Sequence, residues 1–240
     1  MFADATIVFD PDGTLVDTAP DLTNALNDVL TRRGLEPVAI EAIRGAVSHG
    51  ARVMIEEALA SAGARGDVDR MLAEFLVHYE ANIARESRPY PGALAALDRL
   101  AAHGATLAIC TNKRERLSRL LLQELGIEHY FSALAGRDTF PVAKPDPGHL
   151  TGVIALARGD PSRSVMIGDS DVDLRAAHAA SIPAILVSFG YGACPADGVA
   201  PGAVIDHFDE LEGRLAALLN GGRGPALTRL KRLNPAADRA

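Results

Sequence analysis

Residues 7–18 have the sequence IVFDPDGTLVDT, an apolar run that stops at two aspartates separated by one residue. The apolar part is β-branched and aromatic, which is typical of a fully buried strand. The Asp-Pro-Asp-Gly segment that follows has the composition of a turn. In an open parallel sheet, ligands bind at the carboxyl ends of the strands, so Asp10 and Asp12 stand where chemistry is expected. On this stretch alone, an acidic turn without function explains the residues equally well.

The rest of the chain divides into a helical stretch and an alternating one. Residues 19–88 show helical apolar periodicity without a strand, and we predict that they form a separate helical insertion. From residue 89 onward helices alternate with strands, which are predicted at 106–110, 133–135, 164–167 and 184–187. This alternation predicts an α/β fold with a doubly wound parallel sheet and helices on both faces. Residues 1–18 and 89–219 then form the core domain, and 220–240 a flexible tail.

Composition narrows the classes of function. Of the 240 residues, 48% are hydrophobic and 23% are charged, which is ordinary for a soluble globular protein. The net charge of -7 argues against a nucleic-acid partner, since phosphate backbones are bound through Lys and Arg. We expect no membrane partner and a cytoplasmic location, because no signal peptide or long apolar run is present. The two cysteines suit a reducing compartment, and we expect a monomer or a homodimer.

Polar side chains follow four of the predicted strands or lie in the loops after them. Right-handed crossovers place the carboxyl ends of parallel strands on one edge of the sheet, so these side chains are expected to converge there. The residues are Asp10, Asp12, Thr111, Asn112, Lys144, Asp169 and Asp173.

The charges at this edge predict a metal and a phosphate. Four converging carboxylates repel one another, and one lysine cannot compensate them, so a hard divalent cation is expected. Few protein carboxylates, with water and a substrate phosphate as further ligands, favour Mg²⁺ over Ca²⁺. Asp10 can then attack phosphorus and form an aspartyl-phosphate, while Asp12 transfers protons. Thr111, Asn112 and Lys144 are placed to bind phosphate oxygens.

Four ordered segments resemble the haloacid dehalogenase superfamily of phosphatases. They are Asp10-x-Asp12-Gly13-Thr14, Thr111-Asn112, Lys144-Pro145 and Gly168-Asp169-x-x-x-Asp173. The resemblance extends over the chain to about residue 219, and four segments in this order are highly specific. It implies a phosphatase in which the helical insertion is a cap domain that closes over the site.

The resemblance also implies a role for each matching residue. Asp10 is the nucleophile and Asp12 the general acid and base, with Thr111 and Lys144 as further catalytic residues. Asp10, the backbone carbonyl of Asp12 and Asp169 hold Mg²⁺, and Asp173 acts from behind these ligands.

Within the superfamily, residues 12–22 and 136–138 are most similar to bacterial phosphoglycolate phosphatases. The cap loop that matches residues 48–52 faces the substrate in those enzymes. His49, Gly50 and Arg52 are therefore expected to bind substrate together with Asn112, and Arg52 is a candidate for the carboxylate of 2-phosphoglycolate. The implied reaction is Mg²⁺-dependent hydrolysis of this small phosphorylated metabolite to glycolate and phosphate.

Other interpretations fit some of the same residues. A sugar-phosphate mutase or a phosphatase for another small ester would use the same core. A phospho-accepting signalling module would also combine a strand-end aspartate, Mg²⁺, a hydroxyl and a lysine, but it needs neither the helical insertion nor Asp12. Thr111 and Asn112 also suit a helix N-cap, Asp173 a helix start, and His49 and Arg52 a solvated surface.

One residue departs from the superfamily pattern. Pro11 stands where a larger apolar residue is common. Proline has no backbone N–H, so an amide that the superfamily often directs at the phosphate is missing here. We expect turnover to survive, with the transition state bound by the Asp12 amide, Thr111, Lys144 and Mg²⁺.

Overall fold

The computed structural model describes residues 2–192 and 199–221, and the predicted tail lies almost entirely outside these ranges. Its main sheet has the strand order β5-β4-β1-β6-β7-β8, and all neighbours are parallel. The strands are β1 (Thr6–Phe9), β4 (Thr106–Cys110), β5 (Phe131–Ala135), β6 (Ser164–Gly168), β7 (Ala184–Val187) and β8 (Ala203–Ile205). The predicted α/β class with a parallel sheet is confirmed, and β8 is a strand that the sequence did not indicate.

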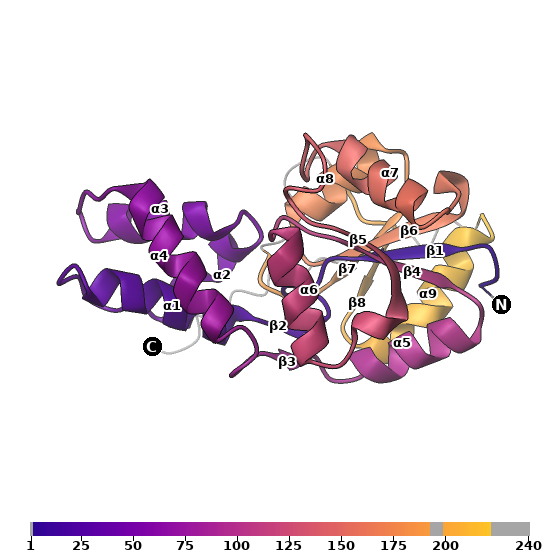
Figure 1. Cartoon of the computed structure of the whole chain (residues 1–240). Coiled ribbons are helices and arrows are strands. Elements are labelled where there is room, and N and C mark those ends of the chain that lie inside the picture. The colour runs from indigo at the N-terminus through magenta and orange to yellow at the C-terminus, as the bar shows by residue number, and fades with distance from the viewer. Residues whose placement is uncertain (1, 193–198, 222–240) are drawn as a thin grey trace, which may run out of the picture.

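Helices cover both faces of this sheet, as Figure 1 shows. Successive residues of β1 point to opposite sides, so Ile7 and Phe9 pack with one group of helices and Val8 with the other. The first group contains α5 (Ala93–Ala102), α6 (Glu115–Glu124) and α9 (Leu211–Leu219). The second contains α7 (Pro147–Leu156) and α8 (Asp171–Ala179). With both faces covered, β1 is buried along its whole length.

Four helices follow β1 before the chain returns to the sheet. They are α1 (Ala19–Thr31), α2 (Ile40–Val47), α3 (Ala51–Ser61) and α4 (Val68–Ala81), and they occupy the predicted helical span without a strand among them. Their apolar faces form a cluster of their own, which also takes in Leu117 and Leu121 of α6. Figure 1 shows these helices beside the sheet rather than on its faces. None of the helices in the described ranges is long and apolar enough to cross a membrane.

A short antiparallel ribbon marks the two points where the chain passes between sheet and helices. β2 (Val16–Asp17) pairs with β3 (Arg88–Pro89) in this ribbon. Next to it, the buried carboxylate of Asp21 accepts hydrogen bonds from the backbone N–H groups of Glu86 and Ser87 and from the Ser87 hydroxyl. The entry and the exit of the helical segment are therefore fastened to each other.

Candidate active site

The turn after β1 places the acidic residue that follows this strand, Asp10, near the acidic residue that follows β6, Asp169. The Asp10 N–H donates to the carbonyl of Ile167 in β6, at 3.0 Å, which places the end of β1 beside the end of β6. Gly13 has a φ of 75°, and a Cβ there would lie 2.3 Å from Oδ2 of Asp169. Glycine is required at this position both by the left-handed backbone and by the approach of that carboxylate.

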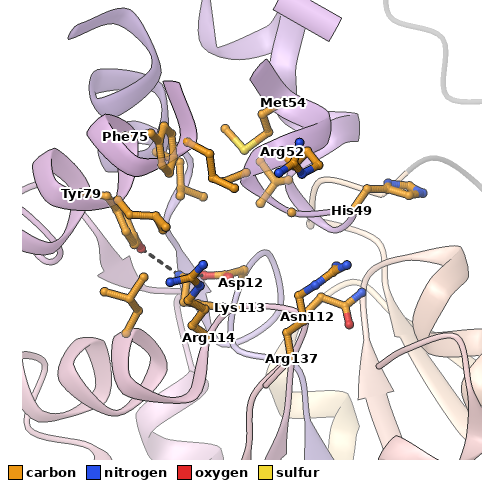
Figure 2. Close-up of a pocket in the computed structure, with 17 residues that line it drawn as sticks. Asp12, His49, Arg52, Met54, Phe75, Tyr79, Asn112, Lys113, Arg114 and Arg137 are labelled. Carbon is orange, nitrogen blue, oxygen red and sulfur yellow. Dashed lines mark hydrogen bonds and ion pairs between the residues drawn. The ribbon is translucent and has the colours of Figure 1, made fainter. Parts of the chain in front are cut away.

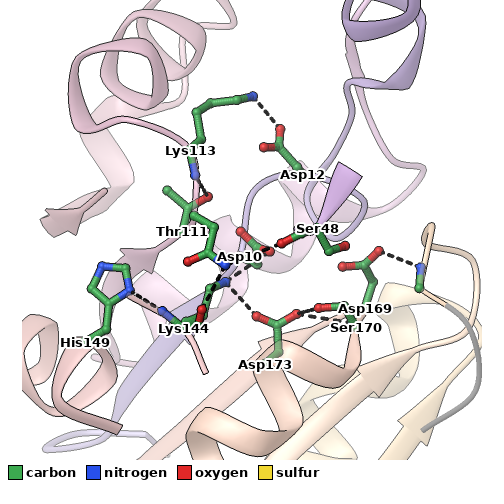
Figure 3. A network of polar contacts seen from close by, with 12 residues as sticks. Asp10, Asp12, Ser48, Thr111, Lys113, Lys144, His149, Asp169, Ser170 and Asp173 are labelled. Atoms are coloured by element: carbon green, nitrogen blue, oxygen red, sulfur yellow. Dashed lines mark hydrogen bonds and ion pairs between the residues drawn. The ribbon is translucent and has the colours of Figure 1, made fainter. Parts of the chain in front are cut away.

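Three of the four carboxylates that were predicted to converge meet at this edge of the sheet, and Asp12 is not part of the group. Asp10, Asp169 and Asp173 are buried, and each contributes an oxygen to a group whose members all lie within 4.8 Å of one another. Lys144 Nζ lies 2.6 Å from Asp173 Oδ1 and 3.1 Å from Asp10 Oδ2 (Figure 3). Asp173 is also part of the α8 N-cap, where it accepts a hydrogen bond from the Ser170 hydroxyl at 2.6 Å. The cluster therefore combines three acids with one buried ammonium group.

The electrostatics of the cluster follow from burial. Burial raises the pKa of Asp10 well above its ordinary value, although Lys144 opposes the change. Burial and the neighbouring Asp173 raise the pKa of Asp169 to about 7. Burial lowers the pKa of Lys144, but Asp10 and Asp173 outweigh it and leave that pKa above its usual range. The cluster has more negative than positive groups, so a further cation would stabilise its charged form.

Two oxygens are free to bind such a cation. Asp10 Oδ1 and Asp169 Oδ1 are buried and have no hydrogen-bond partner among the described residues. A site composed of carboxylate oxygens suits a hard divalent ion such as Mg²⁺. The predicted ligands Asp10 and Asp169 therefore fit the metal, with Asp173 held behind them by Lys144 and Ser170.

The Asp12 side chain faces away from this cluster. Its Oδ1 accepts hydrogen bonds from the Thr18 hydroxyl, at 2.7 Å, and from Lys113 Nζ, at 2.6 Å. The metal role that the resemblance implies for this residue belongs to its backbone carbonyl and does not need this carboxylate. Lys113 also donates to the hydroxyl of Tyr79 in α4, at 2.8 Å (Figure 2). Lys113 directly follows Thr111 and Asn112, but no pattern in the sequence singles it out as a functional residue.

Thr111 and Asn112 lie at the end of β4, beside the cluster. The Thr111 N–H donates to the carbonyl of Ala135, and its hydroxyl accepts from the Lys113 N–H at 3.2 Å. The Asn112 amide donates to the carbonyls of Lys144, at 3.1 Å, and Ser48, at 3.4 Å. Asn112 therefore links the loop that carries Lys144 to the loop between α2 and α3, and its Oδ1 has no partner in the described part of the chain.

Tyr191 is a second residue that the sequence did not indicate. The N–H groups of Tyr191 and Gly192 donate to Oδ2 of Asp169, at 2.7 and 3.1 Å. The Tyr191 hydroxyl donates to Asp17 at 2.5 Å and accepts from the Ala19 N–H at 2.9 Å. One residue thus orients a predicted metal ligand and fastens the start of α1.

The predicted substrate-binding residues of the helical segment line a cavity of about 150 Å³ beside Asp12. His49, Gly50 and Arg52 form part of its wall. Figure 2 shows His49 and Arg52 opposite Asn112 and Lys113. Arg52 is ion-paired with Asp69 and lies 3.9 Å from Glu56, and its side chain is 47% exposed. His49 Nε2 lies 3.8 Å from Asp171. The cavity has the size for a small molecule, and Asp12 stands at its border with the core.

Known proteins resemble this chain over most of its length. A family model described as haloacid dehalogenase-like hydrolase matches residues 7–187. A protein of Mesorhizobium japonicum named phosphoglycolate phosphatase is 50% identical over 89% of this chain and 95% of its own length. A Caulobacter vibrioides protein of the same name is 42% identical over 92% and 94%.

A solved structure has the same fold. The crystal structure of a predicted phosphoglycolate phosphatase from Haemophilus somnus aligns with a TM-score of 0.82 at 28% identity, over 89% of this chain and 98% of that one. These similarities agree with the resemblance drawn from the four segments of sequence.

Proposed function

The chain belongs to the haloacid dehalogenase-like hydrolase family, and we propose that it is a Mg²⁺-dependent phosphomonoesterase that hydrolyses 2-phosphoglycolate to glycolate and phosphate. The observation that carries this proposal is the buried group of Asp10, Asp169 and Asp173 beside Lys144. The relatives named phosphoglycolate phosphatase support the substrate, as does a cavity that suits a small molecule. A cytoplasmic location and a monomeric or homodimeric state stay predictions.

In this proposal Asp10, the Asp12 carbonyl and Asp169 hold Mg²⁺. When bound, the ion neutralises the carboxylates and the phosphate oxygens, which lets a carboxylate approach the phosphate dianion. Support comes from the two unpartnered oxygens of Asp10 and Asp169.

The chain's own residues then divide the reaction between them. An oxygen of Asp10 attacks phosphorus, the bond to the ester oxygen breaks, and protonated Asp12 gives that oxygen its proton. In the second half, Asp12 takes a proton from water, the water oxygen attacks phosphorus, and Asp10 is released. Lys144 and Thr111 balance charge on the transferred group and bind its oxygens.

Asp12 must leave its present partners during this sequence. Its Oδ1 is held by Thr18 and Lys113, whereas the leaving oxygen lies near Asp10. We propose that the four helices act as a cap whose closure over the sheet edge accompanies this movement. Two contacts link the cap helices and their loops to the site, namely Tyr79 with Lys113 and Ser48 with Asn112.

The test is a phosphate-release assay over small phosphate esters, with Mg²⁺ and with EDTA. We expect the highest kcat/KM with 2-phosphoglycolate and loss of activity in EDTA. Phosphate transfer between the hydroxyls of a hexose 1-phosphate, without release, would instead indicate a mutase. A long-lived aspartyl-phosphate with no phosphate release from any ester would indicate a signalling module.

A further inference from the structure

Lys113 is a buried cation that the proposed reaction leaves unused. Its side chain is 6% exposed, and its ammonium group is held by Asp12 at 2.6 Å and by the Tyr79 hydroxyl at 2.8 Å. It also lies over the Tyr79 ring, 4.9 Å from the centroid. Lys113 and Asp12 both line the 150 Å³ cavity. A small ligand in that cavity therefore meets this ammonium group beside the proposed acid and base.

We propose that Lys113 binds the carboxylate of the substrate, and that this contact replaces its contact with Asp12 and so frees Asp12 for the leaving oxygen. The inference rests on the proposed function, because it supposes a substrate with a carboxylate close to its phosphate ester.

The length of the substrate favours Lys113. In 2-phosphoglycolate one methylene separates the ester oxygen from the carboxylate, so ordinary bond lengths place the carboxylate carbon only about 2.4 Å from that oxygen. Asp12 must come within hydrogen-bond distance of the same ester oxygen, at roughly 2.7 Å, to protonate it. The carboxylate is thus confined to the neighbourhood of Asp12, and Lys113 is the cation that contacts Asp12 before Asp12 moves to the ester oxygen.

Arg52, the candidate from the sequence, is less suited to this role. It lies on the far side of the cavity from Asp12 in Figure 2, and its charge is already balanced by Asp69 and Glu56. Its side chain is 47% exposed, whereas that of Lys113 is 6% exposed. Because charge pairs are stronger out of water, the buried ammonium group discriminates more sharply between a phosphate ester with a carboxylate and one without it.

An exchange of partners keeps the buried ammonium group of Lys113 paired at every stage, and the Asp12 carboxylate that it releases takes up a proton from the solvent before it acts as the acid. Lys113 gives up one carboxylate, that of Asp12, and receives another from the substrate, so no isolated ammonium group is left in the interior. The Tyr79 hydroxyl holds Nζ in place during the exchange. A phosphate ester without a carboxylate offers no replacement, so Asp12 stays bound to Lys113. The carboxylate should therefore affect kcat as well as KM.

The first test compares 2-phosphoglycolate with ethyl phosphate, which has a methyl group in place of the carboxylate. Both esters are measured in the wild type, in Lys113→Met and in the matched variant Arg52→Met. We expect the wild type to have a higher kcat/KM for 2-phosphoglycolate than for ethyl phosphate. In Lys113→Met the ratio of the two kcat/KM values should fall at least about 30-fold, because truncating one partner of a buried charge pair is costly. Lys113→Arg should retain part of it. Because each variant is measured with both esters, general damage cancels in the ratio.

The second test needs no variant. The phosphate ester of 3-hydroxypropionate moves the carboxylate one methylene further from the ester oxygen. We expect the wild type to turn it over with a lower kcat/KM than 2-phosphoglycolate. Faster turnover of the longer acid would place the carboxylate receptor across the cavity and overturn the inference.

The outcomes separate the two proposals. A wild type without preference for 2-phosphoglycolate over ethyl phosphate overturns the proposed function, and the role of Lys113 with it. In a second outcome the wild type prefers the acid, and this preference is kept in Lys113→Met but lost in Arg52→Met. That outcome upholds the proposed function and assigns the carboxylate to Arg52. Loss of the preference in Lys113→Met alone, with poorer turnover of the longer acid, supports the exchange at Asp12.

Discussion

His149 gives the protein a predictable sensitivity to acid. The ring is fully buried in α7, its Nδ1 accepts the N–H of Lys144 at 3.1 Å, and its Nε2 lies 3.0 Å from the carbonyl of Gly136. Burial, reinforced by the charge of Lys144, lowers the pKa of His149 from 6.5 to about 4. The folded protein therefore keeps this ring neutral under conditions in which the unfolded chain protonates it.

The pH dependence of the unfolding free energy follows from the difference between the pKa of His149 in the folded state and in the unfolded state. The folded pKa lies below the unfolded one, so the stability due to neutral His149 is complete above pH 6.5 and is lost as the pH falls toward 4. Between pH 7.5 and pH 4.5 the loss amounts to roughly 2 to 3 kcal/mol of unfolding free energy. Asp10 and Asp169 act in the opposite direction, because their raised pKa values make the folded state easier to protonate in the same interval.

The comparison of the wild type with His149→Asn isolates the contribution of this ring. Asparagine keeps an acceptor for the Lys144 N–H but does not titrate. The measurement is urea denaturation in EDTA at pH 7.5, 6.0 and 4.5. As the pH falls, the unfolding free energy of the wild type should decrease by roughly 2 to 3 kcal/mol more than that of the variant. Parallel pH dependence in the two proteins would refute the assignment of a buried neutral imidazole.

Further predictions concern the turn after β1. Asp10→Asn should reduce phosphate release by at least about 1,000-fold without unfolding the protein, as measured by turnover and circular dichroism, because it removes the proposed nucleophile. Pro11→Leu should raise kcat/KM by up to about 10-fold, because it restores a backbone donor to the phosphate, and an unchanged value contradicts that reasoning. Gly13→Ala should lower the unfolding free energy by at least about 1–2 kcal/mol, because the backbone at this position is left-handed. The new methyl group would also displace the Asp169 carboxylate and weaken Mg²⁺ binding, which calorimetry measures.

Much of the site was predictable because its signals are local. Asp10 ends a run of buried strand residues and begins a turn, and both signals lie within a few positions of each other. Asp169 and Asp173 follow β6 in the same way, and the α8 N-cap explains the second of them. Parallel strands then bring these ends together, because topology fixes the common edge.

The residues that the sequence did not reveal act through contacts between distant segments. Lys113 pairs with Asp12 across 101 positions, and Tyr191 reaches Asp17 across 174. A lysine in a loop is ordinarily expected at the surface, and nothing in its neighbours signals burial. A tyrosine that orients a carboxylate through its backbone N–H leaves no trace in side-chain patterns, because any residue supplies that group.

Short strands were missed for a related reason. β8 has three residues, and the strands of the β2–β3 ribbon have two each. Periodicity needs a longer window to be recognised, so such segments are defined by their partners rather than by their own composition. The ribbon still matters for the site, because it follows the catalytic turn and fixes where the helical segment begins.

The two aspartates of the first turn belong to different networks, although one residue separates them. Asp10 faces Lys144 and the acidic cluster of the core, whereas Asp12 is bound to Lys113, which is bound in turn to Tyr79 of α4. A movement of α4 would therefore be transmitted to Asp12 through one lysine and would leave the contacts of Asp10 in place. In the proposed reaction the nucleophile and the acid can thus be controlled separately. The sheet holds Asp10 in place, and we expect the release of Asp12 to depend on what enters the cavity beside Lys113.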